Sequence, residues 1–320
     1  MKQKASFDPG LTQRFDAPMR RAINKDGSFN VRRVGASWRA FHPWLHVVNM
    51  SWRGFVVLVV SFYLLLNLGF ASLYFLLGPD AVIGSASPTE SGRLLNCFFF
   101  SGHTLTTVGY GTLAPHGFAA NMAATLEALV GLLGFAIITG LLVARVSRPS
   151  ARIQYSANAI IGPYQDGTAL MFRIANERSN NLMELDAQVL LMQVVSKQGG
   201  HLERKFDMLA LERNTVLMFP LTWTIVHPID ENSALFGKTA EDLRSVQAEV
   251  LILVKGFDET FSQIVHTRYS YRADEIVWGA KFSPAFRVDE TGGMVLELDK
   301  VGDLRTEPPA LPNNPALSDN

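Results

Sequence analysis

The sequence predicts a membrane α + β protein: two transmembrane helices with a re-entrant helix between them, followed by a β-sandwich. Two observations predict the membrane part, since 48% of the 320 residues are hydrophobic and two long runs carry almost no charge. The third is a change after about residue 153 to short runs rich in β-branched and aromatic residues, separated by turn residues. These patterns predict five segments in order: an N-terminal segment (1–35), an amphipathic helix (36–52), a two-span unit (53–149), a β-sandwich (150–302) and a flexible tail (303–320).

The amphipathic helix is predicted from aromatic and aliphatic residues that recur every three or four positions, with Arg and His between them. Its tryptophans, Trp38, Trp44 and Trp52, stand just before a membrane entry, where tryptophan is enriched at the lipid–water boundary. Pro43 is expected to bend it. A soluble docking helix with an aromatic core face is the alternative.

The two spans are predicted at 54–77 and 118–146. The first contains no charged residue and is long enough to cross a bilayer with some tilt. The second contains Glu127 and ends in a basic stretch. Between them, the apolar run at 92–105 is too short to cross, so we expect it to enter the membrane and return. Arginines cluster before the first span and after the second, which places both termini in the cytoplasm by the positive-inside rule.

The β-sandwich is predicted from runs such as TALMFRIA, DAQVLLMQVV and AEVLILVKGF. The tail contains four prolines among polar residues and lacks the apolar content to pack. The charge balance of 29 basic and 29 acidic residues gives no global field for nucleic acid, and Cys97 as the single cysteine excludes an intrachain disulfide. The polar, charged N-terminus does not resemble a cleaved signal peptide.

Residues 107–111 read Thr-Val-Gly-Tyr-Gly, which is the known signature of potassium selectivity filters. In such a filter, backbone carbonyls from four chains replace the water around K⁺, and non-helical backbone is tolerated at membrane depth only where it is buried or lines water. The glycines permit the alternating backbone that turns successive carbonyls toward one axis. We expect K⁺ at Thr107, Val108, Gly109 and Tyr110, with Gly111 completing the filter and Thr106 supporting it.

The helices before and after the filter are also expected to help a cation pass through the pore. The predicted re-entrant helix would point its C-terminal carbonyl end, with its partial negative charge, at a central cavity. Inner-helix positions spaced by three and four residues are candidates to line the pore, although helix packing explains them nearly as well: Gly131, Phe135, Ile138, Leu142 and Val146. Gly131, Gly134 and Gly140 permit either bending or close helix contact.

Seven further strings are specific: KDGSFN, FFFSGHTLTTVGYG, TLEALVG, LLVARVSRP, FRIANER, TIVHPIDENSALFG and DEIVWGAKF. On these strings, the chain resembles the bacterial inward-rectifier (KirBac-like) potassium channels over about 26–286. The resemblance implies a homotetramer in the bacterial inner membrane, a slide helix before the first span and an immunoglobulin-like cytoplasmic sandwich. It also implies that no enzyme activity and no cofactor are present, and that K⁺ is the permeant ion.

The resemblance further implies gating at the cytoplasmic end of the inner helix, where Leu142 and Val143 are the expected constriction and Phe135 is a second candidate. Regulation by anionic lipids, phosphoinositides among them, is a family trait, although ordinary positive-inside charge explains the same arginines equally well. The candidate lipid-binding residues are Arg32, Arg33, Arg53, Arg145, Arg148 and Arg152.

Three residues depart from the family pattern: Phe135, His103 and Thr112, the last of which follows the filter where many potassium channels have Asp. Phe135 stands where strongly rectifying relatives carry an acid, so we expect weak rectification, with Asp258 and Glu259 as candidate cytoplasmic pore acids for Mg²⁺ or polyamine block; Ba²⁺ is a further expected blocker. His103 stands where relatives place Glu or Gln behind the filter. It is either a neutral strut or, because imidazole titrates near neutrality, a pH sensor.

Other functions are less well supported. A nucleotide-gated channel would need a Gly-rich phosphate loop after the inner helix, and no such motif follows. A membrane-tethered sensor whose spans only anchor the sandwich is a second class. An enzyme is a third, but His201, His227 and His266 lack metal-ligand spacing and no Ser or Cys lies in a nucleophile context.

Overall fold

The structure is a computed structural model that describes residues 10–11, 14–15, 21–32, 34–35, 42–147, 151–196 and 202–306. The chain divides into two compact units. We call residues 34–148 the helical unit, and residues 1–33 together with 149–320 the β unit. Each is described by itself.

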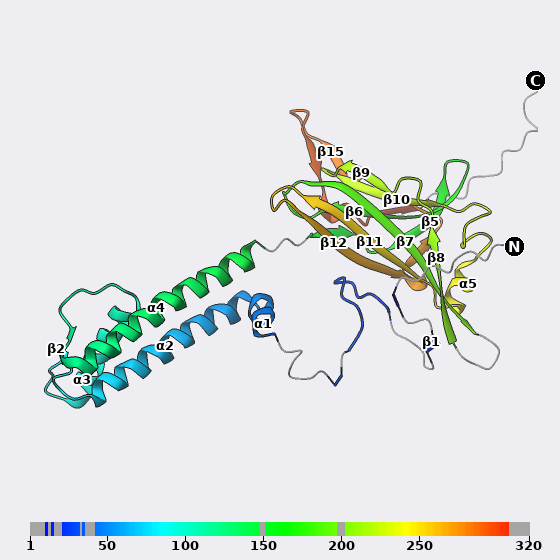
Figure 1. Ribbon diagram of the computed structural model, residues 1–320. Helices are drawn as coiled ribbons and strands as arrows, with labels where there is room; N and C mark the ends of the chain where they lie inside the picture. Colours follow the sequence, from blue (N-terminus) through cyan, green and yellow to red (C-terminus); the bar gives the residue numbers. More distant parts are fainter. Residues whose placement is uncertain are drawn as a thin grey trace, which may run out of the picture. The chain divides into compact units, whose positions relative to one another are not determined.

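The helical unit contains two long apolar helices among its described residues, α2 (Trp52–Leu76) and α4 (Gly117–Val146), which lie alongside each other (Figure 1). Both are long and apolar enough to cross a membrane, with mean hydropathies of 2.2 and 2.3. Their most apolar windows are only 11% and 6% buried, whereas the core helix of a soluble protein is mostly buried. The apolar side chains therefore face outward, as contact with lipid requires.

The re-entrant helix is α3 (Glu90–Leu105), which starts two residues before the predicted 92–105. Thr89 caps it by accepting a hydrogen bond from the Gly92 amide at 3.2 Å. Strands β2 (Val82–Ile83) and β3 (Ala114–Pro115) pair across the two connections that flank it. A small core joins the three helices, with contributions from Ala71, Tyr74, Cys97, Phe100 and Ala123.

The predicted amphipathic helix at 36–52 ends earlier than predicted at its C-terminal side. Helix α1 runs from Pro43 to Asn49, while 36–41 lie outside the described residues. Pro43 does not bend the helix but starts it, because proline at the first helical position loses no hydrogen bond. Trp52 belongs to α2, because Ser51 caps α2 by accepting from the Gly54 amide at 3.1 Å.

The β unit is a two-sheet sandwich within its described residues. One sheet has the order β1-β8-β7-β11-β12 with β9 beside β7, and the other has the order β10-β6-β5-β13 with β4 beside β6 (Figure 1). The first sheet comprises β1 (Arg14–Phe15), β7 (Leu182–Ser196), β8 (Leu202–Leu209), β9 (Thr215–Met218), β11 (Glu249–Asp258) and β12 (Gln263–Arg272). The second comprises β4 (Ile153–Tyr155), β5 (Ala159–Tyr164), β6 (Gly167–Asn176), β10 (Thr222–Pro228) and β13 (Ile276–Trp278).

The core of the sandwich follows the two-residue period of its strands. Alternate residues of β6, β7 and β11 point into one continuous apolar cluster, in which every such side chain is nearly inaccessible to solvent. These positions are Leu170, Phe172, Ile174, Val189, Leu191, Val250, Ile252 and Val254. The register places Leu191 opposite Val250 and Val189 opposite Ile252, so the pairing brings like-facing apolar residues together.

Short elements complete the β unit: α5 (Ala240–Ser245), the 3₁₀ turns η2 (Ala273–Glu275) and η3 (Leu298–Lys300), and the strand pairs β14 (Ala280–Phe282) with β17 (Leu304–Thr306) and β15 (Phe286–Val288) with β16 (Met294–Leu296). Regular structure in the β unit therefore continues beyond residue 302, where the sandwich was predicted to end. It continues because β17 pairs with β14, with Phe282 opposite Leu304.

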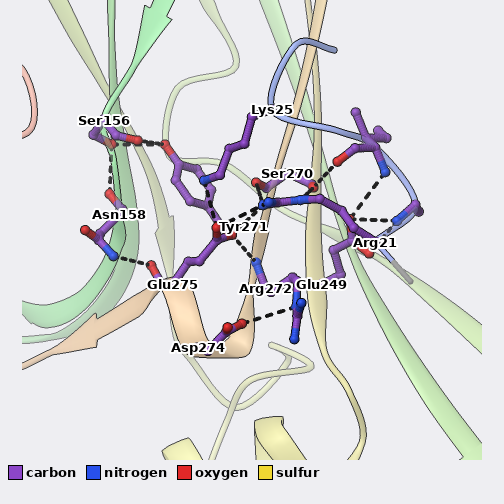
Figure 2. A network of polar contacts seen from close by, with 12 residues as sticks. Arg21, Lys25, Ser156, Asn158, Glu249, Ser270, Tyr271, Arg272, Asp274 and Glu275 are labelled. Carbon is purple, nitrogen blue, oxygen red and sulfur yellow. Dashed lines mark hydrogen bonds and ion pairs between the residues drawn. The ribbon is translucent and has the colours of Figure 1, made fainter. Parts of the chain in front are cut away.

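The N-terminal segment 21–32 is part of the β unit and not a separate element. Ala22 and Ile23 are buried against apolar residues of β7, β8 and β11. Glu249, only 2% exposed, accepts hydrogen bonds from the backbone amides of Ala22 and Ile23 (Figure 2). A buried carboxylate is tolerated where several donors surround it.

Arg21 and Lys25 of the same segment both form ion pairs with Glu275 (Figure 2). Arg21 pairs with Glu275 and also donates to Ser270, while the Lys25 ammonium lies 3.0 Å from Glu275 and 4.6 Å from the centre of the Tyr269 ring. Burial alone would raise the pKa of Glu275, but the Arg272 amide, Lys25 and Arg21 together hold that pKa below its usual value. The segment is thus held by two carboxylates: Glu249 accepts from its backbone amides, and Glu275 pairs with its Arg and Lys side chains.

Candidate functional site

The residues after α3 form an irregular stretch in which every second residue has a positive φ. The values are +59° at Thr107, +59° at Gly109 and +82° at Gly111. This alternation turns successive carbonyls toward the same side of the chain. Gly109 and Gly111 adopt such angles without strain, whereas Thr107, a β-branched residue, does so rarely. Sequence reasoning assigned this geometry to the glycines and missed Thr107.

The amides of this stretch are held by the last turn of α3. The carbonyl of His103 accepts from the Val108 amide at 2.9 Å and from the Gly109 amide at 3.4 Å, and the Thr104 carbonyl accepts from the Thr107 amide at 3.0 Å. The hydroxyl of Thr106 donates to the Gly102 carbonyl at 2.6 Å. Because the amides bond backward to the helix, the carbonyls of the stretch are left free to bind a cation.

His103 braces the stretch through its ring as well as its carbonyl. The imidazole meets the Tyr110 ring edge to face, with 4.9 Å between the ring centres. Such contacts contribute on the order of 1 kcal/mol. Tyr110 and Val108 are otherwise 72% and 50% exposed in a single chain. The His103 ring therefore packs against the filter residue Tyr110, and the strut and pH-sensor interpretations of His103 both stay predictions.

Behind the filter lies a buried carboxylate that the sequence showed only as the one acid in an apolar span. Glu127 of α4 is fully buried and accepts hydrogen bonds from the Tyr74 hydroxyl of α2, at 2.7 Å, and from the Ser101 hydroxyl of α3. The Ser101 hydroxyl also lies 3.2 Å from the Asn67 carbonyl. One side chain thus links the outer, re-entrant and inner helices. An acid in the middle of a span, with a Tyr and a Ser in the two neighbouring helices, was the available signal.

Gly131 of α4 lies directly against the C-terminal end of α3. A Cβ atom there would collide with the carbonyl oxygen of Leu105, whereas Gly134 and Gly140 have no atom within 4 Å of the corresponding position. Of the two roles the sequence left open for these glycines, the structure assigns close helix contact to Gly131. It provides no contact that would explain Gly134 or Gly140.

The candidate pore-lining residues are distributed along α4. Phe135 and Ile138 line a cavity of about 420 Å³ together with Thr106, Thr107 and Gly131, so they lie near the inner end of the filter. Leu142, Val143 and Val146 occupy the last two turns of α4 and are 41%, 57% and 57% exposed in the single chain. Their apolar side chains are available for contacts beyond this subunit.

Arg145, a candidate lipid-binding residue, is bound within the helical unit. Its guanidinium donates to the carbonyls of Val48, at 3.1 Å, and Met50, at 2.7 Å, at the C-terminal end of α1. It also lies over the rings of Trp52 and Phe55, 4.9 and 4.7 Å from their centres. A cation at a helix C-terminus is favoured by the helix dipole. The structure therefore gives Arg145 a role in joining α4 to α1.

The other lipid candidates differ in their surroundings. Arg32 and Arg53 are exposed, and Arg152 lies 4.0 Å from Glu177 in an open surface pair. Arg33 and Arg148 lie outside the described residues. Arg53 belongs to the same unit as Arg145 and follows Trp52, whose ring Arg145 contacts, at the start of α2.

The structure does not support Asp258 as a pore-facing acid. Its side chain is fully buried, and its carboxylate accepts hydrogen bonds from Asn180, at 2.8 Å, and from the Thr260 amide, at 3.0 Å. It stabilises the turn between β11 and β12 and cannot reach a passing ion. Glu259 is exposed and accepts from Asn181 at 2.8 Å. It remains the one candidate of the pair that solvent reaches.

Metal-ligating side chains do not gather in the part of the chain that the structure describes. No group of three or more His, Cys, Asp or Glu side chains there could hold a metal ion. His227 is buried between the Ala210 carbonyl and the Ser233 hydroxyl, at 2.6 and 2.7 Å, and burial lowers its pKa. It is a structural residue of the sandwich.

Two outward-facing apolar helices, a re-entrant helix and a carbonyl-presenting stretch define a potassium-channel pore unit joined to a β-sandwich. Comparison with protein families agrees in both parts: residues 58–148 match the ion channel family, and 153–310 match the inward rectifier potassium channel C-terminal domain. The chain belongs to the inward rectifier potassium channel family.

Two relatives show how far the similarity extends. The inward rectifier potassium channel Kirbac3.1 of Paramagnetospirillum magnetotacticum is 38% identical over 289 residues, which cover 89% of this chain and 95% of the relative. The human ATP-sensitive inward rectifier potassium channel 15 is 26% identical over 315 residues, which cover 90% of this chain and 83% of the relative. The family's members are ion channels, so the expectation of a non-enzyme is confirmed.

Proposed function

We propose that four copies of this chain form a potassium-selective pore, through which K⁺ crosses the bacterial inner membrane passively with both termini in the cytoplasm. The observation that carries the proposal is the alternating backbone at Thr107, Gly109 and Gly111, whose amides are bound by α3. One chain supplies one side of each carbonyl ring, so a closed ring needs further copies around an axis. K⁺ ions would bind between successive rings from Thr107 to Tyr110.

The exposed apolar surface of the helical unit supports assembly. Val108 and Tyr110, which belong to the filter, are 50% and 72% exposed in the single chain, and Phe135 on α4 is 72% exposed. Neighbouring copies would cover Val108 and Tyr110, while Phe135 would face the cavity below the filter. Non-helical backbone at this depth then becomes buried or lines the pore, as a membrane requires.

The gate is proposed at the cytoplasmic end of α4. Leu142, Val143 and Val146 carry apolar side chains that, repeated around an axis, would form a constriction that closes by dewetting. Arg145 ties this end to α1, so movement of α1 along the membrane surface would move the constriction. Arg53 and Arg152, which are exposed, are better placed than Arg145 to bind anionic lipid head groups, phosphoinositides among them.

Rectification is proposed to be weak. Phe135 offers no charge to a blocking cation in the cavity, and Asp258 is buried, which leaves Glu259 as the accessible acid of the predicted pair. Replacing Phe135 with Asp in each subunit would place four carboxylates around the cavity, so block by internal Mg²⁺ or spermine should become strong. Currents from reconstituted channels, recorded with and without internal spermine, test this. Equal block of wild type and Phe135→Asp would show that residue 135 does not face the cavity.

The proposal is tested by rubidium uptake into potassium-loaded liposomes that contain the purified protein. Uptake should resist excess external sodium, stop with Ba²⁺ and disappear in Gly109→Ala, because a methyl group opposes the positive φ at this position. Gly69→Ala on α2 is a matched control, since nothing lies within 4 Å of its Cβ position. Absence of uptake by folded, tetrameric wild type in several lipid compositions would favour a tethered sensor.

A further inference from the structure

The loop between α2 and α3 passes directly against the chain that leaves the filter. We call the end of the filter at Gly111 its outer end, because Thr107 at the other end lines the cavity. Gly84 of the loop has a φ of +82°, and a Cβ atom there would collide with the backbone carbonyl oxygen of Thr112. Glycine permits both this angle and this approach, which a side chain would oppose. Gly84 therefore decides how closely the loop approaches the outer end of the filter.

Backbone pairing joins the same loop to the residues after the filter. Strand β2 pairs with β3, and the His116 amide donates to the Ala81 carbonyl at 2.9 Å. Val82 of β2 is only 2% exposed and belongs to the core that joins the three helices. Strand β2 lies with α3 at the end of the helical unit away from α1 (Figure 1). The chain that leaves the filter is therefore attached to a loop that the core itself holds in place.

The loop is also attached to α3 by a side chain. Asn96 donates from its side-chain amide to the Ser85 carbonyl at 3.2 Å. Ser85 is only 1% exposed, and its hydroxyl donates to the Val82 carbonyl at 2.7 Å, within the turn that follows β2. Buried polar groups whose partners are in place rigidify the chain that carries them. We call residues 81–85, which link α3 to the chain that leaves the filter, the connector.

The two ends of the filter are supported differently. At the inner end, carbonyls in the last turn of α3 accept from the amides of Thr107, Val108 and Gly109. Within the described part of the chain, no backbone hydrogen bond to α3 comes from a filter amide after Gly109. At the outer end, Gly84 packs against Thr112, and β2 pairs with β3. The connector thus supports the part of the filter backbone to which α3 forms no hydrogen bond.

We propose that the connector sets the geometry of the outer cation sites, with Gly84 and Asn96 as positioning residues that act through Thr112. The inference rests on the proposed potassium pore. A filter carbonyl replaces water around a cation only where it points at the ion, so a displaced Thr112 would turn the carbonyls of Tyr110 and Gly111 away. The inner end would keep its place, because α3 holds its amides. A change in the connector should therefore alter cation binding from the outer side and leave binding in the cavity unaffected.

The test uses the full-length protein reconstituted in planar bilayers, with K⁺ currents blocked either by external Cs⁺ or by internal tetraethylammonium. External Cs⁺ probes the outer cation sites, whereas tetraethylammonium is too large to enter the filter and probes the cavity. Gly84→Ala should weaken block by Cs⁺ at least about fivefold, the effect of one lost contact to the ion. Its block by tetraethylammonium should stay within about twofold of wild type.

The matched control is Gly78→Ala, at the start of the same loop. Gly78 also has a positive φ, of +113°, but no atom lies within 4 Å of its Cβ position. The control therefore introduces the same kind of backbone strain without the collision at Thr112. Both kinds of block should stay within about twofold of wild type in this variant.

A second variant decides the question if Gly84→Ala does not assemble. Asn96→Ala adds no atom and removes the hydrogen bond to Ser85, so it should weaken Cs⁺ block about threefold and leave tetraethylammonium block unchanged.

The inference fails if Cs⁺ block is not weakened in Gly84→Ala, or in Asn96→Ala where Gly84→Ala does not assemble. It also fails if Gly78→Ala weakens Cs⁺ block as much as Gly84→Ala does, or if block by Cs⁺ and by tetraethylammonium weaken together. Such results, obtained while wild type conducts K⁺, would leave the proposed function intact. A folded, tetrameric wild type that conducts no K⁺ would overturn the proposed function and this inference together.

Discussion

The helical unit and the β unit differ in where their apolar side chains lie: the β unit buries them in a core, and the helical unit exposes most of them. In the β unit, Leu185, Phe172 and Ile252 are within 1% of complete burial, and the sandwich provides its own core. In the helical unit, the long helices leave most of their apolar side chains exposed, and what they bury is a small cluster that includes polar groups. The sandwich buries its core within one chain, whereas the long helices leave their apolar side chains exposed, as membrane-spanning helices do.

The difference shows that polar groups position the helices of the helical unit, whereas apolar burial stabilises the β unit. In water, burying aliphatic side chains drives folding; in lipid, an apolar side chain gains little from a neighbouring helix, so packing and hydrogen bonds position the helices. This is why Glu127, Ser101 and Tyr74 lie at the junction of three helices, while the centre of the sandwich is filled by Leu, Ile, Val and Phe. The following predictions compare the two units directly.

The largest expected effect separates the same kind of truncation in the two units. Leu185→Ala should destabilise the sandwich by about 3 kcal/mol, because a fully buried leucine leaves a cavity. Val57→Ala, at a side chain 63% exposed on α2, should change stability by no more than about 0.5 kcal/mol. Thermal unfolding in detergent, followed by fluorescence and tetramer content, measures both. Equal losses would contradict the contrast between the units.

Glu127→Ala should cost about 2 kcal/mol, because the Tyr74 and Ser101 hydroxyls lose their buried acceptor. It should also reduce discrimination between K⁺ and Na⁺, since Ser101 belongs to the helix that carries the filter. Glu127→Gln is the matched control and should retain most of both properties, as an amide can still bond to two hydroxyls. Unchanged sodium permeability in the alanine variant would make Glu127 a stabilising residue alone.

Arg21→Gln should loosen the N-terminal segment without unfolding the sandwich. The pair with Glu275 is partly buried, so its loss should speed hydrogen exchange at Ala22 and Ile23 by about fivefold, equivalent to roughly 1 kcal/mol. Arg244→Gln, whose pair with Glu241 is exposed, should leave these amides unchanged. Equal exchange in Arg21→Gln and wild type would mean that Glu249 and apolar burial hold the segment alone.

The same segment should respond to acid. The pKa of Glu275 in the folded protein lies below its ordinary value of 4.5, so its contribution to stability is present above 4.5 and is lost as the pH falls through the lower, folded-state pKa. After correction for the intrinsic rate, protection at Ala22 should therefore be constant from pH 8 to 5 and decline at more acid pH. In Glu275→Gln, the part of this decline that Glu275 contributes should be absent.

The smallest expected effect concerns His103. Because its ring packs against Tyr110 and its carbonyl holds the filter amides, wild type and His103→Gln should show the same dependence of macroscopic conductance on pH between 6 and 8. His116 lies at the start of α4 and should be replaced by Gln in both backgrounds, so that the comparison isolates position 103. A conductance that changes with pH only when His103 is present would support the pH-sensor hypothesis.

The sequence predicted the order of elements well, because the signals for apolar spans and alternating strands are local. Residues 54–77 and 118–146 were expected as spans, and α2 and α4 differ from them by one or two residues. The slide helix was predicted too long, because the hydrophobic period continues through Ser51 although capping ends α1 before it. The filter was recognised as a known motif, not worked out from its chemistry.

What the sequence did not predict depends on contacts between distant residues. No residue close to Asp258 in the sequence indicates that Asn180 contacts it, so the burial of Asp258 was not predicted. The link from Arg145 to Met50 spans 95 residues, and the docking of Arg21 on Glu275 spans 254. Periodicity cannot show such contacts. They depend on the sheet register and helix packing, which the structure supplies.

The central claim is that the backbone from Thr107 to Gly111 selects K⁺. The most direct measurement is the reversal potential of reconstituted channels under K⁺/Na⁺ bi-ionic conditions, for wild type, Gly109→Ala and Gly69→Ala. We predict a strongly K⁺-selective potential for wild type and Gly69→Ala, and loss of current or of selectivity for Gly109→Ala. A Gly109→Ala channel that conducts with wild-type selectivity would contradict the account.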